Sequence, residues 1–437
     1  MSAKSQIATL LGKELTRLLF NPIVVITLVT FLLALCLATV RSVDAYNWNL
    51  DQYNSITGPQ PEGEVSNFGT NVMVAPRPNH ILARGVSDIM SRPVGVMRQI
   101  RASFNMKYSV GQERRQTELI YSLVPDVDPM MAMRYLLAVL ALLFAFDQVC
   151  AERQRGTLQQ SLANPVRRRT LLTAKILAGL LALAVVVAMA ALLVFATLWA
   201  METSIPTAEL WRTGAIFVAA FLYGASFLAI GILVSASVRT AGVSILVCLA
   251  LWCLLVIVAP GAISQLAGAL SPTPPAHSIY MTKLSIERNM RGSEVQEGTL
   301  EYLREFNREK LDAISREDEN FHNLVMRQEA LAQGMGLISP AIAFESVATA
   351  FAGTGVAEEH EMLRQLYRHF RALAEEDAFE AELAQRTEPD ELPEFDYRPL
   401  PPEALVRGSL AQWGALVIIT VILFGLAYWR FNRYDVR

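Results

Sequence analysis

The sequence predicts an all-α membrane protein with six transmembrane helices, an N-terminal helix on the membrane surface and a mainly helical domain outside the membrane. Of its 437 residues, 53% are hydrophobic and only 18% are charged, whereas charged residues make up about 25% of an ordinary soluble domain. Six apolar runs are each long enough to cross the ~30 Å hydrocarbon core of a bilayer. Two polar segments, 41–130 and 263–409, interrupt the series of apolar runs. The chain is therefore a membrane protein with sizeable polar parts.

Residues 1–21 are predicted to form an amphipathic helix at the cytoplasmic surface. Apolar side chains recur at helical spacing while charged ones fill the other side, as in helices that lie flat on a leaflet. Asn21-Pro22 then separates this helix from the first membrane helix, because proline interrupts helical hydrogen bonding. The alternative is that residues 1–21 are the soluble start of that membrane helix. The apolar residues are Ile7, Leu10, Leu11, Leu15, Leu18 and Leu19, and the charged ones Lys4, Lys13, Glu14 and Arg17.

The six predicted membrane helices are oriented by the basic residues at their ends. Short loops rich in Lys and Arg stay in the cytoplasm, and six crossings place every such cluster on the same side. The N-terminus, the loop 151–172, the turn at Arg239 and the tail 430–437 are then cytoplasmic. No cleavable signal peptide is evident, so the first run is predicted to stay as a membrane helix. The predicted spans are 22–40, 131–150, three within 173–262 (173–199, 213–235 and 241–262) and 410–429.

The segments 41–130 and 263–409 are predicted to lie outside the membrane. The first carries proline-rich turns. The second begins with a stiff proline-rich exit over 271–275. It continues with charged, amphipathic helical patterns over 281–335 and 357–386. We expect these to pack as helical hairpins that need no disulfides. The four cysteines, Cys36, Cys150, Cys248 and Cys253, lie in or at the ends of apolar runs and are interpreted as packing residues.

The loop 151–172 is the most informative cytoplasmic segment. Gly156-Thr157 is a candidate start for a short helix, Leu158 and Leu162 fall on one face of it, and Asn164-Pro165 is a candidate stop. Its charge alone favours contact with anionic lipid head groups. Its basic residues are Arg153, Arg155, Arg167, Arg168 and Arg169.

The pattern Glu-x-x-x-Gly-Thr-Leu-x-x-x-Leu, followed by Pro, Arg and Lys, resembles the loop after the second membrane helix of ABC-2 type exporter permeases. In those proteins the loop forms a coupling helix that sits in a groove of a separate ATPase subunit. The resemblance implies an ATPase-coupling site here, with Arg155 beside the matching positions. Those positions are Glu152, Gly156, Thr157, Leu158, Leu162, Pro165, Arg169 and Lys175.

A second resemblance concerns the outer segments. Ser339-Pro340 followed by Ala343-Phe344, then Ala352-Gly353-Thr354 and Phe370, is similar to ABC-2 permeases with a large extracytoplasmic insert, of the gliding-motility and copper-enzyme-maturation type. Ala75-Pro76-Arg77-Pro78 and Gly85 in the first outer segment extend the likeness. It implies a bacterial inner membrane protein with two permease subunits, identical or different, and an ATPase under each. It does not define a cargo.

The sequence predicts no catalytic activity for this chain. It has no phosphate-binding loop, so ATP and Mg would be bound by the partner ATPase, and it has neither a zinc-protease nor a serine-hydrolase motif. No catalytic, cofactor or metal site is expected, and no basic face suits nucleic acid. The histidines are His80, His277, His322, His360 and His369. Asp147, near the inner end of the second span, is expected to pair with Arg153 or Arg155 or to reach the membrane surface.

The function predicted from these features is the permease subunit of an ATP-driven ABC-2 exporter. The first alternative is a mechanotransmitting subunit whose outer helices act on a periplasmic partner, with nothing crossing the bilayer. The large segment 263–409 favours that alternative. A membrane scaffold or receptor unrelated to ATPases comes next, and a membrane enzyme is the third.

Overall fold

The structure is a computed structural model, and it describes most of the chain. The described residues are 11–18, 20–57, 70–72, 74–85, 94–96, 106–108, 127–157, 168–292, 300–375 and 395–433. Within these ranges, five helical segments are long and apolar enough to cross a membrane: Pro22–Ser55, Arg168–Ala200, Thr207–Ser237, Ala241–Leu270 and Pro402–Asn432. They coincide with five of the six predicted spans.

The first and last of these helices are longer than predicted. Helix α2 (Pro22–Thr57) continues well beyond residue 40, where the apolar run ends, and α18 (Pro402–Asn432) begins before residue 410. Helical hydrogen bonding does not stop where side chains become polar, so an apolar run fixes the membrane-embedded part of a helix and not its full length. Residues 11–18 are helical as predicted, and the Asn21 side chain accepts a hydrogen bond from the Ile23 N–H at the start of α2.

The predicted span 131–150 is interrupted. The apolar helix Pro129–Leu143 consists of α5 (Pro129–Ala132), the π-helical η3 (Met133–Leu137) and α6 (Ala138–Leu143). A turn over 144–149 leads to the short α7 (Cys150–Gln154). The Ser235 hydroxyl, from a helix far along the chain, accepts hydrogen bonds from the N–H groups of Val149 and Cys150, which stabilises this interruption.

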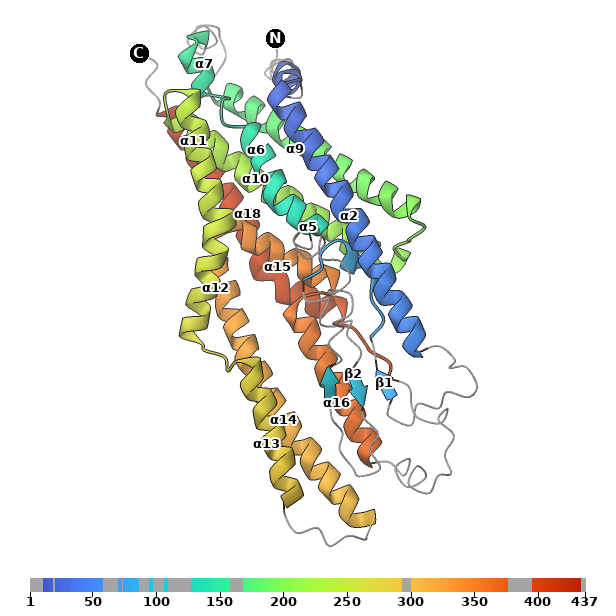
Figure 1. Ribbon diagram of the computed structural model, residues 1–437. Coiled ribbons are helices and arrows are strands. Elements are labelled where there is room, and N and C mark those ends of the chain that lie inside the picture. The colour runs from blue at the N-terminus through green and yellow to red at the C-terminus, as the bar shows by residue number, and fades with distance from the viewer. Residues whose placement is uncertain are drawn as a thin grey trace, which may run out of the picture.

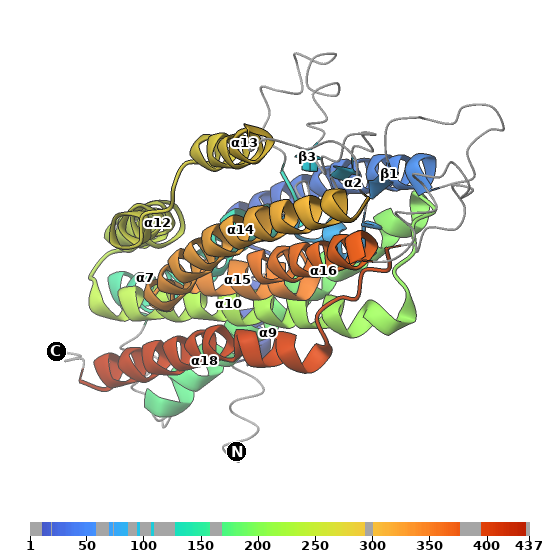
Figure 2. The same ribbon diagram turned by 90° about the horizontal axis from the view of Figure 1, so that it is seen from below.

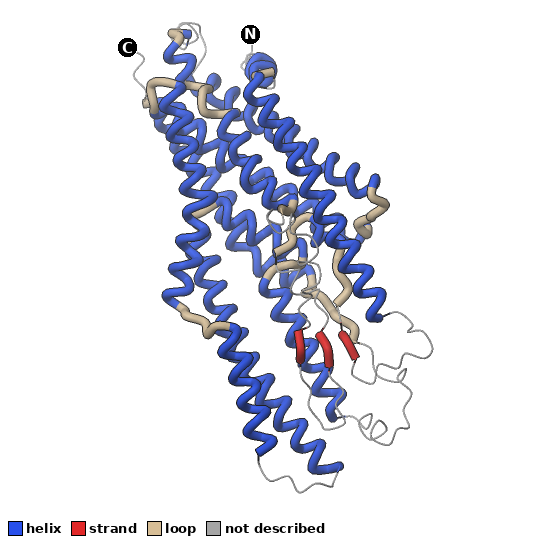
Figure 3. The backbone as a smooth tube through the Cα atoms, in the orientation of Figure 1, coloured by secondary structure: helices blue, strands red, loops and turns tan. Residues whose placement is uncertain are grey.

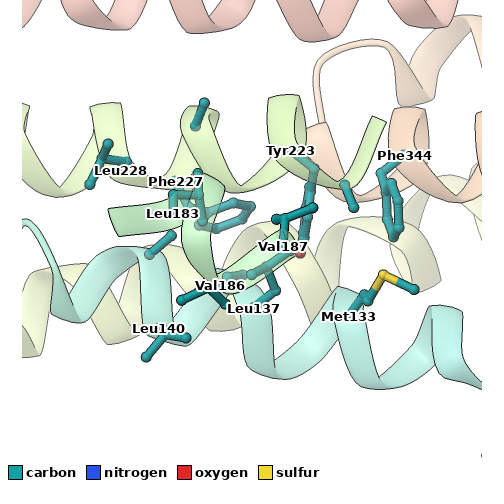
Figure 4. Close-up of a cluster of buried hydrophobic side chains, with 14 of the residues drawn as sticks. Met133, Leu137, Leu140, Leu183, Val186, Val187, Tyr223, Phe227, Leu228 and Phe344 are labelled. Carbon is teal, nitrogen blue, oxygen red and sulfur yellow. The ribbon is translucent and has the colours of Figure 1, made fainter. Parts of the chain in front are cut away.

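Helix α10 (Leu210–Ser237) forms the centre of the membrane bundle, against α9 (Arg168–Ala200), α6 and α18. Added Cβ atoms at Gly179 and Gly224 would lie 2.9 Å from Leu228 and Leu183, respectively, so each glycine receives a leucine of the facing helix. Figure 4 shows this apolar core, in which η3, α6, α9 and α10 contribute labelled side chains, together with Phe344 from later in the chain. The tight α9–α10 packing makes these two helices a rigid pair.

Helix α15 (Pro340–Ala352), within the segment predicted to lie outside, packs deep against the membrane helices. It contacts α10 and α18, and Phe344 stacks on Tyr223 with ring centroids 4.9 Å apart. Tyr223 lies near the middle of α10, so α15 reaches the level of the bundle's centre. The apolar run 340–352 is too short to span a bilayer, which explains why the sequence alone did not separate it from the outer domain.

A π-helical segment of another membrane span lies beside α15. The span Ala241–Leu270 contains α11 (Ala241–Trp252), the π-helical η5 (Cys253–Val258) and α12 (Ala259–Leu270). The N–H of Ala259 bonds to Leu254 and Pro260 has no N–H, so carbonyls of η5 lack helical donors. Side chains replace them: the Ser339 hydroxyl donates to the Leu255 carbonyl and the Arg134 guanidinium to the Val256 carbonyl.

The remaining elements gather at one end of the molecule (Figure 1). Helices α13 (Ala276–Gly292) and α14 (Leu300–Gly336) form a long hairpin, and α16 (Val356–Glu375) packs beside α14 (Figure 2). The all-α prediction needs one correction, because the first outer segment contains three short strands (Figure 3). Strands β1 (Thr70–Val72), β2 (Val94–Val96) and β3 (Met106–Tyr108) form an antiparallel sheet in that order, near the 3-10 helix η1 (Pro78–Ile81).

The two ends of the bundle differ in what they carry. The N-terminus, the C-terminus and α7 share one end, called here the inner end, while α13, α14 and α16 extend from the opposite, outer end (Figure 1). This shared location agrees with the predicted topology. Which end faces the cytoplasm stays a prediction from the positions of Lys and Arg.

Candidate coupling site at the inner end

Five charged side chains meet at the inner end: Glu14, Arg17, Asp147, Glu152 and Lys175. We call them the inner charge cluster. Lys175, in α9, is completely buried, and its ammonium nitrogen lies 2.7 Å from Glu14 Oε1 and 2.7 Å from Glu152 Oε1. Because a buried ammonium is stable only when paired and hydrogen-bonded, these two carboxylates are what allow a lysine inside the bundle.

Arg17 closes the cluster from the other side. Its guanidinium donates to Asp147 Oδ2 at 2.9 Å and lies 3.6 Å from Glu152 Oε1 and 3.9 Å from Glu14 Oε2. Glu152 therefore touches both cations. The three carboxylates and two cations come from the helix over 11–18, the turn over 144–149, α7 and α9.

This arrangement ties the chain around residue 152 to two other elements. Removing one partner of a buried ion pair leaves an uncompensated charge, which typically costs about 3–5 kcal/mol. The N-terminal helix, α7 and α9 cannot separate without breaking such contacts. Glu152 thus connects the start of the loop to α9 and to the N-terminal helix through ion pairs.

The family follows from comparison with known proteins. Residues 61–436 match the family described as ABC-2 family transporter protein, which is most of the chain. The protein belongs to the ABC-2 transporter family. It is a multi-pass membrane component of such a transporter, typically a non-catalytic subunit that works with an ATPase. A search of curated proteins found no match to this chain.

Because the chain belongs to the ABC-2 family, the loop after Glu152 is the segment of interest for contact with an ATPase. The structure describes the start of this loop, up to Thr157. Gly156 adopts φ +73°, a left-handed conformation that favours glycine. The Thr157 hydroxyl donates to the carbonyl of Glu152 at 3.2 Å, so the chain turns sharply after α7. Arg155 is exposed at this turn. The predicted coupling residues Leu158, Leu162 and Pro165 lie outside the described residues, and their role stays a prediction.

The chain re-enters the described part of this ABC-2 subunit at α9. Arg169 is exposed on its first turn, with its guanidinium carbon 5.9 Å from the centroid of the Tyr428 ring on α18. Arg168 donates to the carbonyl of Asn432, near the end of the same helix. The basic end of the loop is thus attached to α18, while its acidic beginning is attached to the N-terminal helix.

The predicted partner of Asp147 was wrong. Its carboxylate binds Arg17 of the N-terminal helix, which the sequence did not indicate as a partner. The turn over 144–149 separates Asp147 from the helical register of Arg153 and Arg155, so spacing in sequence did not apply. A lysine within the apolar run of α9 was the signal for a buried ion pair, but its second acidic partner, Glu14, lies 161 residues away.

The described residues contain no group of three or more His, Cys, Asp or Glu side chains arranged to hold a metal. The inner charge cluster also has its acids paired with cations. The ion pairs at this site connect the helices to one another.

Proposed function

We propose that the protein is the permease subunit of an ATP-driven exporter and that the inner charge cluster couples a separate ATPase to the membrane helices. ATP and Mg are bound by that ATPase, and two permease subunits, identical or different, assemble around a shared path in a bacterial inner membrane. Membership of the ABC-2 family supports this proposal. The single observation that carries the coupling role is Glu152, which precedes the predicted coupling helix and contacts both Lys175 and Arg17.

The proposed mechanism follows from these contacts. Closure of the ATPase dimer on ATP moves the loop 151–172. Glu152 transfers the displacement through Lys175 to α9, which is 33 residues long, and through Arg17 to the N-terminal helix. The packing of α9 on α10 then carries the motion toward the outer end.

The coupling assignment is tested by substituting the two predicted groove residues. Leu158 and Leu162 are one helical turn apart in the predicted helix, and burying a leucine contributes about 1.5–3 kcal/mol. Changing both to Asp should sharply reduce co-purification of the ATPase and its ATP turnover, while membrane insertion is preserved.

The matched control changes Arg167 and Arg168 to Gln, which should reduce ATPase association much less because charges beside a groove contribute about 0–1 kcal/mol each. The hydrogen bond of Arg168 to the Asn432 carbonyl lies within the permease. Contact of the loop with lipid predicts the reverse ranking. An Asp double variant that keeps its ATPase at full occupancy with normal turnover would show that the assignment is wrong.

The second candidate function is mechanotransmission to a periplasmic partner. The observation that favours it is the α13–α14 hairpin at the outer end (Figure 1). Helix α14 has 37 residues, which corresponds to about 55 Å. Proteoliposomes containing the permease and its ATPase discriminate the two functions. Export predicts ATP-dependent movement of cargo, whereas mechanotransmission predicts ATP turnover that depends on an outer partner without transport.

A further inference from the structure

A second polar site lies where the membrane bundle meets the outer elements. We call it the outer junction and define it by Arg77, His80, Arg212, Gly353 and Glu358. Arg77 precedes η1, His80 lies within it, and Arg212 is on the first turn of α10. Gly353 ends α15, and Glu358 is on the first turn of α16. Four separate elements thus converge on this site.

The outer junction contains several buried donors without acceptors. Nη1 and Nη2 of Arg77 and Nη1 of Arg212 are buried and make no hydrogen bond, and neither ring nitrogen of His80 makes one of good geometry. Arg212 is only 6% exposed and His80 only 9%. Buried polar groups are almost always satisfied, and a cluster of unsatisfied ones commonly marks a bound water or ion.

The two arginines approach the same point. A Cβ atom placed on Gly353 would lie 3.0 Å from Arg77 Nη1 and 3.8 Å from Arg212 Nη1. Gly353 has φ +75° and no side chain, so the space above its Cα is left for these two nitrogens and whatever lies between them. Two guanidinium groups that converge in a buried place repel each other unless an anion separates them.

The nearby carboxylates of the described residues make no ion pair with Arg212 and only one with Arg77. Glu358 Oε1 accepts a hydrogen bond from the Tyr397 hydroxyl at 2.8 Å and lies 3.3 Å from Arg77 Nη2. Glu209 Oε2 accepts from the Asn79 amide at 2.9 Å. Glu358 Oε2 is buried and makes no hydrogen bond, so this carboxylate faces Arg77 through its other oxygen. Among the described residues, no carboxylate lies within ion-pair distance of Arg212. Nη1 of Arg77 and Nη1 of Arg212 therefore both lack a hydrogen-bond acceptor.

We propose that the outer junction binds a small monovalent inorganic anion, chloride under physiological conditions, between Arg77 Nη1 and Arg212 Nη1 above Gly353. The anion accepts hydrogen bonds from both guanidinium groups and lowers their mutual repulsion. Because the arginines belong to the first outer segment and to α10, and Gly353 joins α15 to α16, the anion fastens the outer helices to the membrane bundle.

Halide titration of the purified full-length protein tests this site. Chloride replaces gluconate at constant ionic strength, and Tm is followed by intrinsic fluorescence. Tm should rise with chloride and saturate, and bromide should act similarly. Line broadening of the ³⁵Cl resonance should report the bound anion directly. Arg212→Gln should abolish both responses.

The matched control is Arg364→Gln, because Arg364 is on α16 but its side chain is 52% exposed and pairs only with Glu361 among the described residues. This variant should keep the full chloride response. A Tm that follows ionic strength irrespective of the anion, with no ³⁵Cl broadening by the wild type, would overturn the proposal and leave water as the occupant. The wild-type titration decides the matter even if Arg212→Gln fails to fold.

Discussion

The inner charge cluster and the outer junction are both buried polar sites that join several elements, but they are held together differently. At the inner end, Lys175 and Arg17 are each surrounded by carboxylates at 2.7–3.9 Å. At the outer junction, Arg77 has one carboxylate at 3.3 Å and buried nitrogens without acceptors. At the inner site every charged group has a partner of opposite charge, although Glu14 Oε2 and Glu152 Oε2 make no hydrogen bond. At the outer junction the unpaired groups are the cationic nitrogens themselves, which is why we propose a bound anion there.

Uncharged contacts do more of the joining at the outer junction. The Thr354 hydroxyl donates to the Ala83 carbonyl at 2.9 Å, and the Thr213 hydroxyl donates to Asn79 Oδ1 at 2.8 Å. The backbone at Gly85 comes so close to Thr354 that a side chain would not fit. The elements at the inner end are therefore joined mainly by charged contacts, whereas the outer elements are attached mainly by close backbone approach. Substitutions should therefore rank differently at the two sites.

The largest effect is expected for Lys175→Met. Methionine fills a similar volume but leaves Glu14 and Glu152 without their shared cation, and breaking a buried ion pair typically costs about 3–5 kcal/mol. The free energy of unfolding of the purified permease should fall by about that amount, and ATPase association should weaken. The triple variant with Glu14→Gln and Glu152→Gln as well should recover much of the stability, because it leaves no uncompensated carboxylate at Lys175. Wild-type stability in Lys175→Met would show that the cluster does not hold these helices.

The next effect is expected for Gly85→Ala, which tests close approach at the outer junction. The added Cβ would lie 2.4 Å from the Thr354 carbonyl oxygen, and Gly85 has φ +44°. Overpacking typically costs about 1–3 kcal/mol, and the positive φ adds strain. Thermal unfolding measures the loss. Gly355→Ala is the matched control, since its Cβ would meet nothing closer than 3.8 Å. Equal stability of the two variants would contradict the close packing.

Much of this fold was predictable because apolar runs of about 20 residues determine membrane helices almost irrespective of context. Five spans followed from that rule, and the helix described over 11–18 followed from the helical spacing of apolar residues in 1–21. The interruption of the remaining span, 131–150, could not be predicted in this way, because it depends on Ser235, which lies 85 residues from Cys150 in the sequence. The burial of α15 was missed for the same reason, since its partners on α10 and α18 are distant in sequence.

The candidate sites divide in the same way. Glu152 and Lys175 both belong to the motif that the sequence analysis singled out, but the motif did not indicate that they form an ion pair. Glu14 and Arg17 were predicted only as the polar face of a surface helix, although Glu14 is buried against Lys175. The convergence of Arg77 and Arg212 on Gly353 depends entirely on tertiary packing, so no spacing in the sequence indicated it.

A pH-dependent effect is expected from His80 at the outer junction. Burial and the nearby Arg77 charge lower the pKa of His80 from 6.5 to about 3. Between these values the unfolded chain binds a proton that the folded protein does not, so the free energy of unfolding falls as the pH decreases from about 6.5 toward 3. The slope is at most about 1.4 kcal/mol per pH unit. His80→Gln should reduce this slope in denaturation measured from pH 7 to pH 4, and an unchanged slope would contradict burial of a neutral imidazole.

The smallest effect is expected at an ion pair that lies between the two sites, within the bundle. Arg134 Nη1 is 2.6 Å from Glu345 Oε2, and Arg134 also donates to the Val256 carbonyl left free by Pro260. Charged residues at membrane depth are expensive and are kept where they are paired. Polar interactions between membrane helices nevertheless average only about 0.6 kcal/mol in double-mutant cycles, because partly unfolded states in the membrane find other partners. Glu345 is also partly exposed, which weakens the pair further.

A double-mutant cycle with Arg134→Gln and Glu345→Gln should therefore give a coupling energy near this average. Arg134→Gln should cost more than Glu345→Gln, because only the arginine also satisfies η5. A coupling energy as large as the loss in Lys175→Met would show that the middle of the bundle, and not its inner end, relies most on charge.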